Sequence, residues 1–219
     1  MTFFKRKTGN AVTNYSIKSE KKFNFLEIED SNNFFYGGHQ KWLLDKRNII
    51  NGCGPVAGAN ILSYLSKKNE KYENLYPYED FSKESFSKFQ RKIYDFIKPS
   101  VFGLVNINHF IKKVLIYGKS RNIDLNFEKL TFNNKNFNYN SCYSFIRNAI
   151  NRDLPVAAFN LDLRKKFIFK WHWIVITRIY IDENKNIKVV ASSWGKRYDI
   201  EFMELFNSMK LGGGLVYFY

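Results

Sequence analysis

Asn51-Gly52-Cys53-Gly54-Pro55-Val56-Ala57-Gly58-Ala59 is the stretch that decides the fold, because it predicts a tight glycine turn leading directly into a helix. Proline suits the first turn of a helix, where its missing N–H costs no hydrogen bond. Cys53 therefore opens the helix, beside unpaired backbone N–H groups and the positive end of the helix dipole. This position favours the thiolate and predicts a reactive cysteine.

The residues around the cysteine agree with that role. Gly52 and Gly54 remove side chains where a substrate backbone or carbonyl would approach. The apolar residues after Pro55 predict a largely buried helix that ends near Lys67-Lys68-Asn69. The alternative interpretation is that Cys53 is a small core residue in a turn.

Length and composition predict one domain. The chain has 219 residues, of which 45% are hydrophobic and 18% aromatic, enough for one sizeable core. We expect residues 1–33 to form an irregular N-terminal arm or a short edge element packed on the rest, and residues 34–219 to form a single domain. Its helical part covers about residues 34–152, and its sheet part covers about residues 153–219.

The order of the expected elements indicates the fold class. Helices are expected from the N-cap Ser82 to Ile97 and at about residues 107–117, 141–151 and 201–208. Strands are expected at about residues 155–161, 171–181, 187–192, 197–200 and 215–219, and residues 48–52 are expected to be a loop. Helices come first and a mostly antiparallel sheet follows, which predicts an α+β fold.

Charge and cysteine usage limit the partners. The net charge of +15 comes from 35 Lys and Arg against 20 Asp and Glu, but the basic residues are scattered in pairs and triplets. No helix-turn-helix, zinc-finger or aromatic RNA-binding motif accompanies the charge, which argues against nucleic-acid binding. Cys53 and Cys142 are far apart and give no disulfide framework, so we expect a reducing, cytoplasmic compartment.

Several other classes of site lack a signal in the sequence. No stretch has the apolar length of a membrane span, and the N-terminus lacks the apolar region of a signal peptide. The few histidines and cysteines lack the spacing of metal ligands, so neither a metal nor a cofactor is expected. Cys142 is expected to be a buried residue of a helix.

A nucleophilic thiol needs a base, and the chain offers His39, His109 and His172. His172 is the best candidate, because Trp171-His172-Trp173-Ile174-Val175-Ile176 predicts the start of a strand that would hold the imidazole rigidly. The alternative is a hydrogen-bonded structural histidine. His39 is the second candidate base, and His109 is expected to be structural or exposed.

The next strand ends in Ser192-Ser193-Trp194-Gly195. With this segment the chain resembles the papain-like cysteine peptidases and, more loosely, the bacterial peptidases that remove double-glycine leaders from bacteriocins. In these families a glutamine precedes the cysteine, the cysteine opens a long helix, and a histidine begins a strand. An asparagine or aspartate follows one strand later, before Ser-Trp-Gly in the papain group.

The resemblance implies a role for each matching residue. Cys53 would be the nucleophile, His172 the base and later the acid, and Gln40 the side-chain donor of an oxyanion hole, together with the N–H of Cys53. Trp194 would shield the histidine from water. Ser192 occupies the place of the orienting asparagine or aspartate, and its hydroxyl would orient the imidazole more weakly. Gln40 lies thirteen residues before Cys53, which leaves Asn48 and Asn51 as alternative oxyanion donors.

We therefore expect a papain-like fold and a thiol-dependent hydrolase, a cysteine peptidase acting on a peptide or protein substrate through Cys53 and His172. An acyl transferase would use the same pair of residues. A second hypothesis is a catalytically weak or inactive scaffold that binds an extended chain by strand addition, as Ser192 suggests. Substrate sequence and oligomeric state are not readable from the sequence.

Overall fold

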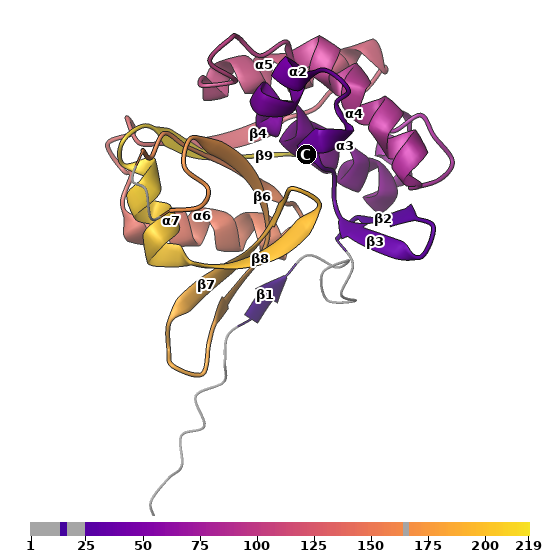
Figure 1. The fold of residues 1–219 in the computed structure, drawn as a ribbon. Helices are drawn as coiled ribbons and strands as arrows, with labels where there is room; N and C mark the ends of the chain where they lie inside the picture. The colour runs from indigo at the N-terminus through magenta and orange to yellow at the C-terminus, as the bar shows by residue number, and fades with distance from the viewer. Residues whose placement is uncertain (1–13, 17–24, 164–166) are drawn as a thin grey trace, which may run out of the picture.

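The central element of the fold is a seven-stranded sheet with helices on both sides (Figure 1). The computed structural model describes residues 14–16, 25–163 and 167–219. Helices α3 (Cys53–Lys68) and α5 (Ile107–Ser120) contact the sheet from one side, and α6 (Tyr139–Asn151) and α7 (Phe202–Met209) contact it from the other. The expected α+β class is confirmed.

The sheet is antiparallel throughout its strand pairs. Its order is β4-β9-β5-β6-β7-β8, and β1 pairs with the second half of β6. The strands are β1 (Asn14–Ser16), β4 (Phe127–Thr131), β5 (Val156–Asn160), β6 (His172–Ile181), β7 (Ile187–Ser193), β8 (Lys196–Glu201) and β9 (Gly213–Phe218). The long strand β6 therefore joins most of the sheet.

Local signals explain where the helices begin. Ser82 caps α4 (Lys83–Ile97) by accepting a hydrogen bond from the N–H of Ser85, as its position in the sequence predicts. Asp45 caps α2 (Lys46–Asn51) in the same way. Two short 3₁₀ helices, η1 (Gln40–Trp42) and η2 (Glu70–Leu75), precede α2 and follow α3.

Some expectations for the first half of the chain are wrong. Residues 27–30 and 33–36 form a hairpin, β2 (Glu27–Asp30) and β3 (Asn33–Tyr36), across the expected end of the irregular arm. The expected loop at residues 48–52 lies largely in α2, and β4 joins the sheet from within the expected helical part. These elements are too short to show a hydrophobic period in the sequence, and the three strands among them are defined by their hydrogen-bonded pairing with another strand. The rest of the arm, residues 1–13 and 17–24, lies outside the described residues.

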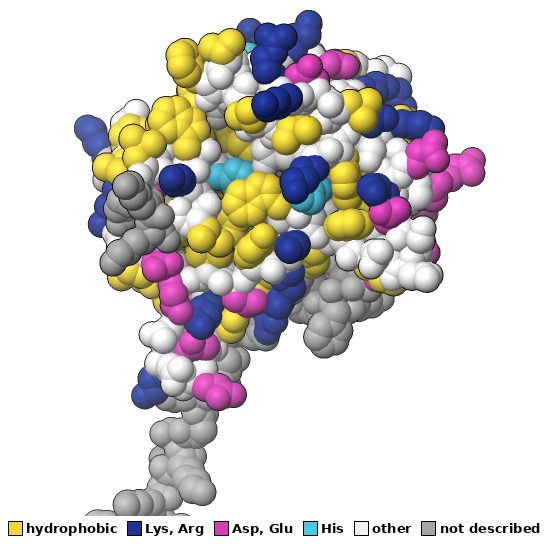
Figure 2. Space-filling model, in the orientation of Figure 1, with side chains coloured by type: hydrophobic (Ala, Val, Ile, Leu, Met, Phe, Trp, Pro, Cys, Tyr) yellow, Lys and Arg dark blue, Asp and Glu magenta, His cyan; other side chains and the backbone are white. Residues whose placement is uncertain are grey.

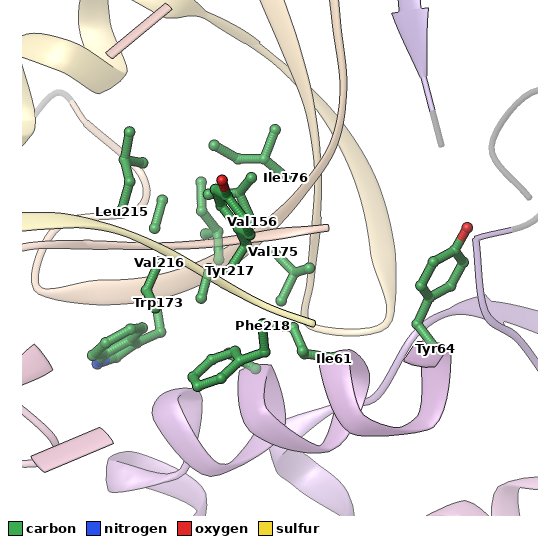
Figure 3. Close-up of a cluster of buried hydrophobic side chains, with 14 of the residues drawn as sticks. Ile61, Tyr64, Val156, Trp173, Val175, Ile176, Leu215, Val216, Tyr217 and Phe218 are labelled. Atoms are coloured by element: carbon green, nitrogen blue, oxygen red, sulfur yellow. The ribbon is translucent and has the colours of Figure 1, made fainter. Parts of the chain in front are cut away.

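Helix α3 is buried along most of its length. Every residue from Gly54 to Leu65 is buried. Figure 3 shows Ile61 of this helix directed toward the cluster formed by Trp173, Val175 and Phe218 of the sheet. The ring of Trp173 stacks on Phe159 with centroids 4.7 Å apart. Burying one large apolar side chain contributes about 1.5–3 kcal/mol, so this interface fixes the helix against the sheet.

The two glycines beside Cys53 are required by packing. A Cβ on Gly54 would lie 2.5 Å from a methyl carbon of Leu104, and a Cβ on Gly52 would lie 2.5 Å from the carbonyl oxygen of Asn48. Packing is thus a second reason for these glycines, and the expectation that they make room for a substrate stays a prediction. They let the loop before α5 and the helix α2 approach the start of α3.

No described helix is both long enough and apolar enough to cross a lipid bilayer. The longest helix, α3, has 16 residues. It is covered by protein on both sides, by the sheet and by helices α4 and α5. Its apolar character is therefore explained by the core.

We expect Gly54→Ala to destabilise the fold by about 1–3 kcal/mol, because the added methyl group overlaps Leu104. Urea unfolding measures the change. Gly58→Ala is the matched control on the same helix, since its Cβ would lie 3.0 Å from the mobile end of Ile97. A Gly54→Ala protein as stable as Gly58→Ala would contradict the packing role.

Candidate active site

Cys53 is the first residue of α3, as the sequence predicts. The residue is half-buried, and the backbone N–H groups of Trp173, Gly54 and Cys53 itself face the thiol. Trp173 follows His172 in β6, and its N–H is near enough to the sulfur to favour the thiolate, so the thiol lies near the start of that strand. The structure thus brings together the helix of Cys53 and the strand of His172.

The protonation of the Cys53 thiol differs from the sequence prediction. The three N–H groups favour the thiolate, but burial acts more strongly and raises the pKa of the thiol above its ordinary value. At neutral pH the resting group is therefore a neutral thiol. The helix start supplies the expected hydrogen-bond donors, and the loss of solvent outweighs them.

His172 begins β6 and is buried. Its Nε2 lies 2.8 Å from Oγ of Ser193. Burial lowers the pKa of the imidazole to about 3, so the ring is neutral at pH 7. With the hydrogen on Nε2 donated to Ser193, Nδ1 keeps a lone pair and can act as a base.

The orienting hydroxyl belongs to Ser193, and the expectation that Ser192 orients the histidine is wrong. Ser192 pairs directly with Val175, and neighbouring residues of a strand point to opposite faces. Ser192 therefore faces the same side as Val175, and Ser193 faces the side of His172. The pairing shifts by one residue between Ile176 and Arg178, so regular alternation through the hairpin would have placed Ser192 on the side of His172, and this irregularity explains the wrong expectation.

Trp194 covers the histidine, as expected. Its ring centroid is 4.5 Å from that of His172, and it stacks on Phe169 at 5.3 Å with an interplanar angle of 14°. Trp194 and Gly195 form the two-residue connection between β7 and β8, and both have positive φ, of 47° and 67°. The turn therefore holds the indole over the imidazole.

Gln40 lies beside the residue that precedes Cys53. It is buried, and a Cβ on Gly52 would lie 3.6 Å from its Cγ. Its Nε2 donates one hydrogen bond to the carbonyl oxygen of Ile49, and a primary amide has a second N–H. Gln40 thus stays a candidate oxyanion donor. Asn51 likewise donates one hydrogen bond, to the carbonyl oxygen of Val101, and its amide also has a second N–H, so Asn51 and Asn48 stay alternative candidates.

The other two histidines have partners of their own. Nδ1 of His39 accepts a hydrogen bond from the N–H of Lys41. Burial, with smaller effects of Lys41 and Lys196, lowers the pKa of His39. Nε2 of His109 lies 3.0 Å from the carbonyl oxygen of Ile97. Neither contact joins these rings to Cys53. Figure 2 shows histidine side chains bordering a hydrophobic area on one face of the molecule.

The loop before α5 closes the site on one side. Three side chains donate hydrogen bonds to its carbonyl oxygens: Asn51 to Val101, Trp171 to Phe102, and Trp173 to Leu104. These donors come from both sides of the site, since Asn51 precedes Cys53 and the tryptophans flank His172. Sequence reasoning missed this loop because its residues show no periodic pattern.

Two further observations concern other candidate groups. Among residues 14–16, 25–163 and 167–219, no group of three or more His, Cys, Asp or Glu side chains is arranged to hold a metal ion. Cys142 is buried in α6, and burial raises the pKa of its thiol to about 12. The arrangement that remains is a thiol, a neutral imidazole with an orienting hydroxyl, and nearby N–H donors.

We expect iodoacetamide to alkylate Cys53 with a midpoint above the ordinary thiol pKa of about 8.5, because burial opposes the thiolate. Peptide mass mapping of samples alkylated at a series of pH values measures the midpoint. Cys142→Ser is the control that removes the second thiol. A midpoint below about 7 would contradict the effect of burial and restore the prediction from the helix start.

Burial of His172 also makes stability depend on acid. The unfolded chain binds a proton on this histidine below pH 6.5, whereas the pKa in the folded protein is about 3. The unfolded state therefore binds more protons between these values, and the free energy of unfolding falls by about 1.4 kcal/mol for each pH unit below 6.5. Above pH 6.5 both states are neutral at this residue and the effect vanishes.

His172→Gln should remove this pH dependence, since glutamine does not titrate. Urea unfolding at about pH 7.5 and about pH 5 compares the variant with the wild type. His109→Gln is the control for replacing a histidine elsewhere and should keep the wild-type acid loss. Equal acid losses in wild type and His172→Gln would show that His172 is not the responsible group.

Comparison with known proteins gives no relative. No protein-family model and no curated protein sequence matches the chain. The likeness to papain-like peptidases therefore stays a hypothesis based on Cys53, His172 and the turn at Trp194.

Proposed function

We propose that the protein is a thiol-dependent hydrolase of peptide or amide bonds, with Cys53 as the nucleophile and His172 as the base. One observation carries the proposal. The thiol at the start of α3 lies close enough to the N–H of Trp173 for that group to favour the thiolate, and Trp173 is the neighbour of His172, whose Nε2 contacts Oγ of Ser193. Nucleophile, base and orienting group are the three parts that such chemistry requires.

The resting pair is neutral, so proton transfer accompanies the attack. His172 Nδ1 takes the thiol proton as the sulfur of Cys53 forms a bond to the substrate carbonyl carbon, and the carbonyl oxygen becomes an oxyanion. The backbone N–H of Cys53 and the second N–H of Gln40 are the proposed donors to that oxygen. A single donor of this type contributes about 10²–10³ to the rate.

The imidazolium then gives its proton to the leaving amine as the C–N bond breaks, which leaves a thioester on Cys53. Water, deprotonated by the neutral imidazole, resolves the thioester and releases the acid. An amine entering in place of water would give acyl transfer through the same residues. Trp194 excludes bulk water from the ring and so strengthens the electrostatic interactions there.

The second candidate is a peptide-binding scaffold with little or no activity. It is favoured by the hydroxyl of Ser193, which carries no charge to stabilise an imidazolium, and by the raised pKa of the thiol. Such a scaffold would bind peptides without Cys53. The two candidates are therefore separable by one variant.

We expect a library of quenched-fluorescence peptides to be cleaved by the wild type and not by Cys53→Ala. His172→Ala should lower kcat by about 10²–10⁴, the usual contribution of a general base. Cys142→Ala is the matched control and should keep wild-type kcat, because that thiol is buried in α6. Mass spectrometry of the protein with a cleaved peptide should detect an acyl adduct on Cys53. Peptide binding that is equal in wild type and Cys53→Ala, without cleavage by either, would establish the scaffold instead.

A further inference from the structure

A buried amide on the cysteine helix connects it to the segment before Gln40. Asn60 lies seven residues after Cys53, about two helical turns along α3, and is 1% exposed. Its Oδ1 accepts the N–H of Gly38 at 2.8 Å. Its Nδ2 donates to Oγ of Ser192 at 3.3 Å. The oxygen and the nitrogen of this amide are thus both hydrogen-bonded to groups other than Cys53 and His172.

Ser192 completes the connection. Its hydroxyl donates to the carbonyl oxygen of Tyr36 at 2.7 Å while it accepts from Asn60. The two side chains therefore hold the backbone on both sides of Gly37, through Tyr36 and Gly38. Within the described structure this is a buried polar network whose donors and acceptors are paired, and such networks specify one arrangement.

The backbone lies directly on this pair of side chains. Gly37 has φ of 80°, and a Cβ there would lie 2.6 Å from Oγ of Ser192 and 3.0 Å from Nδ2 of Asn60. Only glycine satisfies both the left-handed conformation and the close approach. The sequence signal Gly37-Gly38 thus marks the point where the chain crosses the network.

The same segment holds the turn that covers His172. The N–H of Gly195 donates to the carbonyl of Gly38, and the N–H of Tyr36 donates to the carbonyl of Gly195. Ser192 is followed directly by Ser193, the partner of His172. Three segments that carry the candidate site, those of Cys53, Gln40 and Ser193, are therefore joined through one amide and one hydroxyl.

We infer that Asn60 and Ser192 are a positioning pair, which fixes the Ser193-Trp194-Gly195 turn against α3 and thereby holds Ser193 and Trp194 against the His172 ring. The pair lies about 10 Å along the helix from the thiol and acts through Ser193 and Trp194. The effect of this pair on the position of the turn does not depend on the proposed function. Its effect on turnover rests on the proposed function.

The test reads the surroundings of His172 directly. Imidazole NMR signals are titrated between about pH 8 and about pH 4 in wild type, Ser192→Ala and Asn60→Ala. Ser63→Ala is the matched control, because Ser63 is a buried residue of the same helix whose hydroxyl has no hydrogen-bond partner among the described residues. Circular dichroism verifies that each variant is folded.

We expect His172 not to titrate in this range in wild type and Ser63→Ala. In Ser192→Ala the turn loosens, water reaches the ring, and the pKa of His172 moves toward 6.5 by at least about one unit. For a peptide that the wild type cleaves, Ser192→Ala should lower kcat about threefold to tenfold, with a smaller change in KM. Asn60→Ala and Ser192→Ala together should cost little more than either alone, because they act through one network.

A folded Ser192→Ala protein in which His172 stays untitrated and kcat is unchanged would overturn the inference. Ser192→Ala alone decides the question if Asn60→Ala does not fold. The titration needs no substrate, so its result is independent of whether the wild type cleaves peptides. If the pKa of His172 shifts in Ser192→Ala but the wild type cleaves no peptide, the positioning pair is kept and the hydrolase is rejected. If the wild type cleaves peptides but the pKa of His172 does not shift in Ser192→Ala, the hydrolase is kept and the positioning pair is rejected.

Discussion

Burial of α3 is the constraint on which the rest of the structure depends. The helix is enclosed by β5 and β6 on one side and by α4 and α5 on the other, with all residues from Gly54 to Leu65 buried. A helix enclosed in this way has no freedom to slide or rotate without opening the core. Its first residue, Cys53, is therefore held at one place relative to β6, and the loop before α5 can close over Gly54 only because that residue has no side chain.

The same enclosure sets the chemistry of the site. A helix start favours an anion by about 0.3–1 kcal/mol at the surface, whereas removing a charged group from water costs several kcal/mol. For Cys53 the second effect is larger, and for His172 burial acts in the opposite direction on a base, so each group prefers its neutral form. A neutral thiol and a neutral imidazole can still exchange a proton during attack. In the proposed reaction the pair would then act by general-base catalysis, and a preformed ion pair is not required.

The sequence allowed the principal parts to be predicted because each has a strong local signal. Pro55 after Gly-Cys-Gly marked the helix start, the β-branched run after His172 marked its strand, and Ser82 marked the N-terminus of α4. Other features depend on tertiary contacts. The hairpin of β2 and β3 is too short for a period, and the partner of His172 differs from the expected serine by one residue, which reverses the face of a strand. The pKa of Cys53 depends on how completely the protein surrounds it, which no local pattern states.

Two tryptophans show how local preference gives way to the site. Trp171 and Trp194 have φ of 49° and 47°, a left-handed conformation that costs an ordinary residue about 1–2 kcal/mol. Asparagine or glycine would suit the turn at residue 194 better. The indole of Trp194 instead stacks on Phe169 and lies tilted against His172, and that of Trp171 donates to the loop before α5. At residue 194 the backbone is held by the two hydrogen bonds of the next residue, Gly195, with Gly38 and Tyr36. At residue 171 it is held by the hydrogen bond from the N–H of Trp171 to the carbonyl oxygen of Asp162. The ring contacts of Trp194 therefore offset the cost of its backbone conformation, because only a large aromatic side chain at this turn reaches both Phe169 and His172.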